Sequence, residues 1–305
     1  MKNTARLALF GGALALLAAG GFAVGKTAGP VAAATSESSG EGTMPGHAET
    51  AAADLLPDGL AAGKDGYTFA DPTAEPGRFS FRITGPDGKP VTAFDVEHEK
   101  KLHLIVVRRD TAGFQHVHPE MAPDGTWRVP LTVPAAGSYR AFADFAPTGG
   151  KPMTLGVDFS VAGNYQPATY PPSRTAQVDG YTVELAGDLT AGKTSPVTLK
   201  VSRGGVPVTD LQPYLGAYGH LVALRGGDLA YLHVHPDGEP GDGKTAAGPE
   251  VKFAAEVPSA GTYRLFLDFR HGGVVRTAEF TVTTAGTPAA PVPVPAPAPA
   301  DGHGH

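Results

Sequence analysis

The sequence predicts an all-β protein with two tandem immunoglobulin-like β-sandwich domains after an N-terminal signal or anchor segment. Three observations support this prediction: short apolar runs separated by turn signals, many glycines and prolines, and an internal repeat. The chain has 305 residues, with 41 glycines and 29 prolines, which favours short strands over long helices. About a hundred residues in each copy suit a sandwich of roughly seven strands.

The first element is a targeting segment over residues 1–25. Lys2 and Arg6 provide positive charge, and no charged residue follows from Leu7 to Gly25. This pattern is typical of an export signal, and the uncharged run is also long enough for a membrane anchor. The sequence leaves a cleaved signal peptide and a retained signal anchor both open. In either case we expect the remaining chain to lie outside the cytoplasm, secreted or anchored to the membrane.

Four further segments follow. Residues 26–64 are rich in Ala, Gly, Ser and Glu without periodicity, which indicates a disordered linker. Residues 65–163 form β-sandwich repeat 1 and residues 176–284 form β-sandwich repeat 2. Residues 285–305 form a proline-rich tail. The repeats align through "VPAAGSYRAFADF" and "VPSAGTYRLFLDF", whose tyrosines, Tyr139 and Tyr263, we interpret as corner tyrosines.

Charge and composition exclude several classes of function. The formal net charge of −6 gives no reason to expect a nucleic-acid partner. The absence of cysteine excludes disulfides, thiolate metal sites and a blue-copper centre. We find no His-Glu-x-x-His motif, phosphate loop or nucleophile with a base, so we do not expect an enzyme. A metal-dependent hydrolase is the weakest alternative.

Three histidines recur at constant spacing in the two repeats. His220, His233 and His235 each follow a histidine of repeat 1 by 117 residues. Gly226-Gly227 predicts a two-residue hairpin turn, which places His220 opposite His233 with His235 two residues along on the same face. Opposed Cβ atoms lie ~5 Å apart, so three imidazole nitrogens can reach one metal ion.

Repeat 1 carries the equivalent histidines His103, His116 and His118. Its turn, "RRDTAG", lacks the glycine pair and favours a bulge. Equivalence with repeat 2 predicts His103 opposite His116, with His118 beside them. The alternative is that these histidines are exposed or belong to a hydrogen-bonded core cluster.

A fourth ligand would be a carboxylate. The candidates are Glu120, Asp237, Asp144 and Asp268. For the two last-named aspartates, an ion pair with Arg140 or Arg264 on the same strand is the alternative. Three neutral imidazoles with an oxygen suit Cu(II) first, because it leads the affinity order, with Zn(II) as the alternative.

The stretch "LHLIVVRRDTAGFQHVHPE…DGTW…PAAGSYRAFADFAP" resembles the exported bacterial β-sandwich proteins grouped as YtkA-like or FixH-like, which are associated with copper and heavy metals. The sandwich is also loosely similar to CopC-type copper carriers. The resemblance covers Gly66 to Thr284 and rests on the two "HVHP" hairpins. It implies export and metal binding. The chain has no methionine-rich loop, which favours Cu(II) over Cu(I).

We therefore expect an exported protein that binds Cu(II) for buffering, delivery or resistance through two three-histidine hairpin sites. Its partners would be the metal ion and a membrane or exported metal-handling protein. The alternative is a tandem immunoglobulin-like interaction module at the cell surface, in which the histidines are structural.

Overall fold

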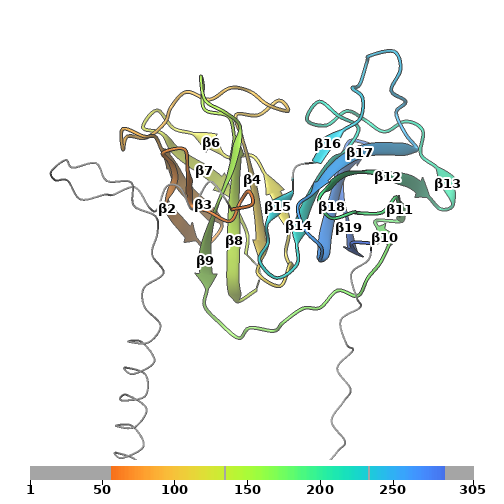
Figure 1. The fold of residues 1–305 in the computed structure, drawn as a ribbon, viewed down its shortest axis with the longest axis horizontal. Helices are drawn as coiled ribbons and strands as arrows, with labels where there is room; N and C mark the ends of the chain where they lie inside the picture. The colour runs from red at the N-terminus through yellow and green to blue at the C-terminus, as the bar shows by residue number, and fades with distance from the viewer. Residues whose placement is uncertain (1–55, 134, 233, 286–305) are drawn as a thin grey trace, which may run out of the picture. The chain divides into compact units, whose positions relative to one another are not determined.

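The computed structural model describes residues 56–133, 135–232 and 234–285, and these residues form antiparallel strands and no helix (Figure 1). The expected signal or anchor segment, most of the expected linker and nearly all of the tail lie outside the described residues. Both repeats belong to one compact unit of the chain.

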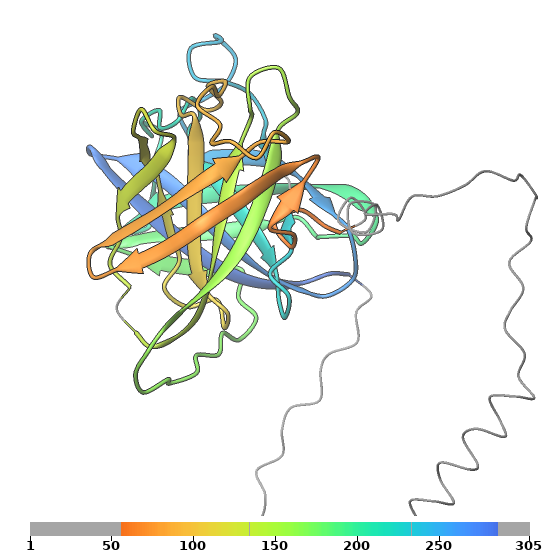
Figure 2. The same ribbon diagram turned by 90° about the vertical axis from the view of Figure 1, so that its left-hand side faces the viewer.

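Repeat 1 is a sandwich of two sheets, with strand orders β1-β2-β3-β7-β6 and β5-β4-β8-β9. Figure 2 faces its β2–β3 hairpin, drawn in orange. The strands of the first sheet are β1 (Gly63–Lys64), β2 (Tyr67–Glu75), β3 (Arg78–Thr84), β6 (Glu120–Met121) and β7 (Thr126–Pro130). Those of the second are β4 (Leu102–Arg108), β5 (Gln115–Val117), β8 (Gly137–Phe145) and β9 (Met153–Val161). Phe79, Phe81 and Trp127 lie in the core of this repeat.

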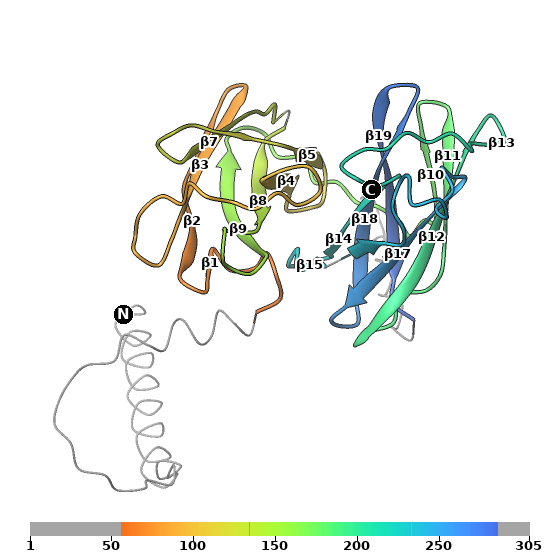
Figure 3. The ribbon, with the colours of Figure 1, turned by 90° about the horizontal axis from the view of Figure 1, so that it is seen from above.

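Repeat 2 has the same plan, with strand orders β10-β11-β12-β17-β16 and β15-β14-β18-β19, and with β13 paired to β12 (Figure 3). The strands of the larger sheet are β10 (Thr175–Val178), β11 (Tyr181–Ala186), β12 (Lys193–Arg203), β13 (Val206–Pro207), β16 (Val234–Pro236) and β17 (Glu250–Val257). Those of the smaller are β14 (His220–Arg225), β15 (Tyr231–Leu232), β18 (Thr262–His271) and β19 (Val274–Thr283).

Two paired sheets in each repeat confirm the predicted fold class, tandem immunoglobulin-like β-sandwiches. The corner tyrosines are confirmed as well. Tyr139 Oη donates to the carbonyl of Ala135 at 2.8 Å, and Tyr263 Oη donates to that of Ser259 at 2.7 Å. In both repeats this hydrogen bond fixes the start of a central strand, β8 or β18, against the preceding turn.

Strand β4 is buried on both faces. Leu104 and Val106 pack in the core of repeat 1, whereas Ile105 and Val107 belong to a separate apolar cluster. Because side chains alternate along a strand, His103 shares the face of Ile105 and Val107. This face turns away from the core of its own sandwich.

The separate apolar cluster joins the two repeats. Its buried members are Ile105, Val107 and Phe142 of repeat 1 and Val222, Leu224, Leu229 and Phe266 of repeat 2. Each of them is at most 4% exposed. The rings of Phe114 and Phe266 stack with centroids 3.9 Å apart. Sheets covered on both sides carry continuous apolar runs, which explains "HLIVV" and "HLVAL".

The connection between the repeats is contacted by side chains of both repeats. Asp110 accepts hydrogen bonds from the amide of Ala168 at 2.8 Å and from Tyr165 Oη at 3.2 Å. The guanidinium of Arg264 in repeat 2 lies 3.9 Å from the ring centroid of Tyr170. The proline-containing connection therefore lies against both sandwiches.

The last residues of the segment expected to be a linker also pack on the fold. The carbonyl oxygens of Gly59 and Leu60 accept hydrogen bonds from the buried Arg140 guanidinium. The Asp58 carbonyl accepts from the amide of Tyr231 in repeat 2 at 2.9 Å. These residues are ordered because a buried guanidinium needs hydrogen-bond acceptors. The described end of this segment therefore differs from a disordered linker.

Candidate metal centre

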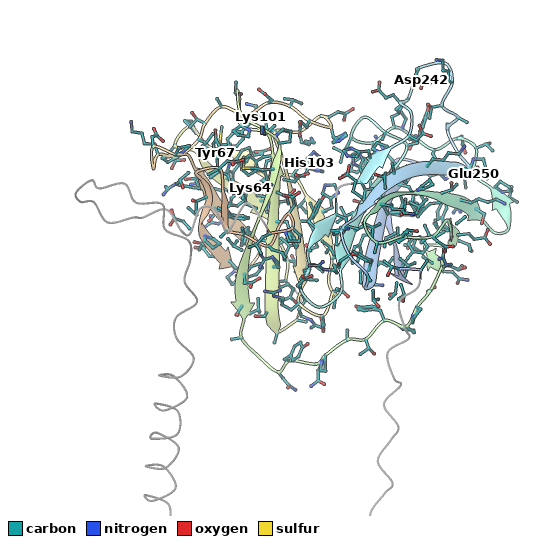
Figure 4. All side chains as sticks on the ribbon, viewed as in Figure 1. Lys64, Tyr67, Lys101, His103, Asp242 and Glu250 are labelled. Carbon is teal, nitrogen blue, oxygen red and sulfur yellow. The ribbon has the colours of Figure 1, made fainter. Side chains whose placement is uncertain are left out.

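Three histidines of repeat 1 converge at one end of strand β4. His103 lies on β4, His116 on β5 and His118 directly after β5; Figure 4 labels His103. One ring nitrogen from each histidine lies within 4.8 Å of the other two. Among the described residues, this is the one group of three or more His, Cys, Asp or Glu side chains with such geometry. We refer to it as the histidine triad.

The hairpin that carries the triad has a different register from the predicted one. Ile105, not His103, pairs with His116, and the same register continued places His103 opposite His118. The prediction for repeat 1 is therefore wrong by two residues. The loop over residues 109–114, longer than a tight turn, displaces β5 relative to β4. His116 is still one same-face step away from the opposed pair, so all three rings remain together.

The hydrogen bonds of the triad fix which ring nitrogens carry lone pairs. His103 Nε2 donates to the Glu97 carbonyl at 3.1 Å, and His116 Nδ1 donates to Asp268 Oδ2 at 2.8 Å. His103 Nδ1 and His116 Nε2 therefore hold lone pairs, and they face each other at 3.1 Å. His118 Nε2 lies 3.2 Å from the same His103 nitrogen. In a tetrahedral site with metal–nitrogen bonds of about 2.0–2.1 Å, two ligand nitrogens lie about 3.3 Å apart.

The ring positions fit the same arrangement. The ring centroids lie 5.3 Å apart for His103 and His116, 5.0 Å for His103 and His118, and 4.9 Å for His116 and His118. Three imidazoles around one tetrahedral ion have centroids about 5 Å apart, given metal–nitrogen bonds of about 2 Å. All three pairs agree with that value, so small side-chain shifts suffice to hold an ion.

The carboxylate that orients His116 comes from repeat 2. Asp268 lies on β18, and its side chain is 5% exposed, as against 4% for His116. Its other oxygen, Oδ1, accepts a hydrogen bond from Thr277 Oγ1 at 2.6 Å. In metal sites, a carboxylate commonly accepts the second N–H of a ligating histidine and fixes its tautomer. Asp268 has this position.

His220 of repeat 2 lies across from the triad. It pairs with Asp268 across the sheet, and its Nε2 donates to the Leu215 carbonyl at 2.9 Å, so Nδ1 holds the lone pair. Its ring centroid is 6.4 Å from that of His103 and 6.3 Å from that of His116. A cavity of about 60 Å³ is lined by residues of both repeats, among them His98, His103, His116, Asp144, His220 and Tyr231.

Burial weakens the basicity of these imidazoles. Burial, and then the neighbouring His116, lowers the pKa of His103 to about 2. The same two causes lower the pKa of His118 to about 3. Burial lowers the pKa of His220 to about 4. These three histidines are therefore neutral at physiological pH, the form in which imidazole binds metals.

The predicted hairpin of repeat 2 has the wrong register. Leu224 pairs with Tyr231, so Gly226-Gly227 does not form a two-residue turn and the pairing differs by two residues. Asp228 explains the difference, because its carboxylate accepts from the backbone amide two residues further on and closes a wider loop. The short strand β15 then ends at Leu232.

The described histidines of repeat 2 do not form a second triad. His235 lies on β16, which pairs with β17 of the opposite sheet, and it is exposed. It lines a cleft of about 380 Å³ together with His98. His233 lies outside the described residues. Of the three histidines proposed for this repeat, His220 is the one whose ring we find beside the triad.

Asp144 of repeat 1 occupies the place that Asp268 has in repeat 2. It pairs with His103 across the sheet, as Asp268 pairs with His220. Thr154 Oγ1 donates to it at 2.8 Å. Asp144 also lines the 60 Å³ cavity. Both aspartates thus lie on the strand face that carries the histidines.

The two arginines considered as partners of these aspartates have other acceptors. Arg140 forms an ion pair with Asp158 at 2.9 Å, and Arg264 forms one with Glu279. Both acceptors lie on the neighbouring edge strand, where a long arginine side chain reaches them from the central strand.

The two carboxylates nearest to the motifs in sequence are exposed. Glu120 is on β6, in the opposite sheet from the triad, and lines a cleft that also includes His118. Asp237 follows β16 and lines a different cleft, next to Lys252. Neither belongs to the group of converging ligand atoms found among the described residues.

Two residues near the triad were not expected there. The ring centroid of His98 lies 5.1 Å from that of His220, and the ring centroid of Tyr214 lies 6.4 Å from that of His118. Both lie in the tight turns that precede β4 and β14. The 117-residue offset makes these turns equivalent, which is the signal that could have drawn attention to them.

A tandem pair of immunoglobulin-like β-sandwiches with a buried histidine triad is the class of protein that this fold and site define. The chain belongs to the family described as "Domain of unknown function (DUF8832)", which matches residues 64–163 and 176–286. The family therefore matches the chain twice, once over each sandwich. No curated protein matches the chain significantly.

Several solved structures are similar to the chain at low identity. Bacterial invasin, an integrin-binding protein, shares 14% identity over 73% of this chain and 37% of its own, with a TM-score of 0.20. Chicken CNTN1 domains FN1–FN3 share 8% over 75% and 66%, with a TM-score of 0.19. A putative membrane-anchored protein of Corynebacterium diphtheriae shares 11% over 70% and 57%, also at 0.19. The chain spans less than two thirds of the length of each.

Within residues 56–285, apart from positions 134 and 233, we find no helix with the length and hydropathy of a membrane span.

Proposed function

We propose that this protein binds a divalent transition-metal ion through His103, His116 and His118. The observation that carries the proposal is the convergence of three ring nitrogens within 4.8 Å. His103 and His116 use their other nitrogens as donors to fixed acceptors, so their free lone pairs point at one another. A buried cation relieves that repulsion, and the site needs little rearrangement to accept it.

The ligand set favours Cu(II), with Zn(II) as the alternative. Three imidazoles without a thiolate suit both ions, and Cu(II) stands highest in the affinity order of divalent metals. A carboxylate behind His116 fixes its tautomer and leaves Nε2 free to bind the ion.

The proposed role is copper buffering, delivery or resistance outside the cytoplasm. The cavity beside the triad holds about 60 Å³, which is room for an ion and one or two waters and not for an organic substrate. This size supports binding and transfer of metal over hydrolysis. The uncharged run of residues 7–25 after Lys2 and Arg6 supports secretion or membrane anchoring, and the partner we propose is another membrane or exported metal-handling protein.

The test is metal analysis of untagged protein. Protein loaded with Cu(II) or Zn(II) is dialysed against a competing chelator of moderate strength, which removes weakly held ions from the histidines near the chain ends. We expect about one equivalent of retained metal, and EPR of the Cu(II) form should show nitrogen hyperfine coupling. His103→Ala should lose this equivalent.

No retained metal in the parent would contradict the proposal. It would favour the alternative of a cell-surface interaction module in which the triad is a structural cluster. In that case His103→Ala would lower the thermal stability of the metal-free protein and change nothing else.

A further inference from the structure

The triad does not stand alone in repeat 1, because repeat 2 supplies a carboxylate that bonds to one of its histidines. The bond from His116 Nδ1 to Asp268 Oδ2 is 2.8 Å long, and both side chains are almost fully buried. Thr277 holds the other carboxylate oxygen of Asp268. The aspartate is thus fixed by repeat 2 and faces a ligand of repeat 1.

Repeat 2 also places a histidine next to the triad. Three nitrogens around a tetrahedral ion leave one position open. The ring of His220 in repeat 2 lies about equally far from those of His103 and His116, with centroids 6.4 and 6.3 Å apart. His103, His116 and His220 line a common cavity of about 60 Å³. His220 presents its Nδ1 lone pair because Nε2 is bonded to Leu215.

The apolar contact beside the cavity holds the two repeats in this arrangement. Phe114, two residues before His116, stacks on Phe266, two residues before Asp268. Phe266 and Asp268 are two residues apart on β18 and share a face, and Phe114 lies directly before β5, so the stacked pair and the hydrogen-bonded pair are neighbours in the same contact. The geometry of the triad is therefore tied to the docking of the repeats.

We propose that the metal centre is a joint site of both repeats, in which Asp268 fixes His116 as an Nε2 ligand and His220 acts at the fourth coordination position. This rests on the proposed function and deepens it, because the ion would link the two sandwiches. Metal affinity would then depend on residues that belong to the other domain.

The test compares two substitutions in repeat 2 with two matched controls in the full-length chain. Asp268→Asn and His220→Gln are the test variants. Asp210→Asn and His271→Ala are the controls, since these residues bond to each other in repeat 2, and neither is among the residues that line the cavity. The probe is Cu(II) alone, titrated against a chelator while the fluorescence of Trp127, the one tryptophan of the chain, is followed.

We expect Asp268→Asn to weaken Cu(II) binding about 10–100-fold, as loss of such a hydrogen-bond partner does in other metal sites. His220→Gln should weaken it as well and should change the Cu(II) EPR spectrum, because one nitrogen near the ion is lost. The controls should bind like the parent. Since Trp127 lies in repeat 1, this response would report an effect of repeat 2 on a site in repeat 1.

Two outcomes would overturn the inference in different ways. If the parent binds Cu(II) tightly and both test variants bind it equally well with unchanged spectra, the proposed function stands and the joint site fails. If the parent binds no metal, both fail together. The metal-free variants must unfold at the same temperature as the metal-free parent. If Asp268→Asn unfolds at a lower temperature, the result for His220→Gln decides the question, because this variant keeps a polar side chain at its position.

Discussion

The two "HVHP" segments are identical in sequence and differ in structure. In repeat 1, β5 stays beside β4 up to Val117, and His118 ends next to His103. In repeat 2, β15 ends at Leu232, and Val234 already pairs with β17 in the opposite sheet. His118 thus lies beside His103 in repeat 1, whereas its counterpart His235 is exposed at a sheet edge in repeat 2.

The strands next to the two segments in the opposite sheets also differ. Strand β7 of repeat 1 has 5 residues, whereas β17 of repeat 2 has 8 and presents a longer edge for pairing. Identical motifs therefore do not imply identical sites, because the pairing of the backbone decides which sheet the side chains join.

The sharpest test of this comparison is to remove one histidine from each repeat. His103→Ala should weaken tight Cu(II) binding by roughly 10²–10³-fold, since each ligand of a four-ligand site contributes on the order of 3–4 kcal/mol. His235→Ala, at the exposed position, should leave it unchanged. Equilibrium competition with a chelator measures both. Equal losses in the two variants would show that the second segment also contributes to a tight site.

The second test concerns the contact that holds the triad against repeat 2. Phe114→Ala removes a half-buried ring stacked on Phe266 and should cost about 2 kcal/mol, below the range for a fully buried phenylalanine. Calorimetry should show the single transition of the parent broadened or divided. Val206→Ala, at an exposed position of β13, is the control. A division of the transition in that control as well would argue against a specific contact.

The third test uses acid. The folded chain holds His103 with a pKa of about 2, against an ordinary value of 6.5, so the unfolded chain takes up the proton first as the pH falls. Stability of the metal-free protein should therefore decrease below pH 6.5, by up to about 1.4 kcal/mol per pH unit for each such histidine. Urea unfolding at several pH values, followed by Trp127 fluorescence, measures this slope.

His103→Gln cannot take up a proton, so its slope should be shallower than that of the parent. His235→Gln, at an exposed position of repeat 2, is the control for removing a histidine elsewhere in the chain. Parallel curves for the parent and His103→Gln would contradict the burial of this imidazole.

The smallest expected effect concerns a feature that the repeats share. Tyr139→Phe and Tyr263→Phe each remove one corner hydrogen bond, and each should cost about 1 kcal/mol. Thermal unfolding measures the loss. Similar values would show that the repeats are equivalent away from the histidines, whereas a loss confined to one of them would show that the difference extends beyond "HVHP".

The sequence was sufficient to predict the fold class, the two repeats and the corner tyrosines, because these depend on local patterns that recur twice. It was not sufficient for the hairpin registers. In repeat 2 the register depends on the Asp228 side chain, which closes a wider loop than Gly226-Gly227 suggests. Turn residues give the location of a turn more reliably than its length.

The grouping of His103, His116 and His118 could be predicted because a change of two residues in register leaves side chains on the same face. The approach of Asp268 could not, since it lies 152 residues from His116 and depends on docking of the repeats. One signal of that docking was present: "HLIVV" lacks polar alternation, as expected for a strand covered on both sides.

The clamped connection between the repeats has a consequence for how strongly they associate. Asp110 of repeat 1 and Arg264 of repeat 2 both contact the connection, at Ala168 and Tyr170, and so restrict its movement. A short, restrained tether gives its two ends an effective concentration in the millimolar range or above. At such a concentration, an apolar contact that is too weak to join separate molecules stays formed within one chain. The second sandwich therefore remains bound to the first.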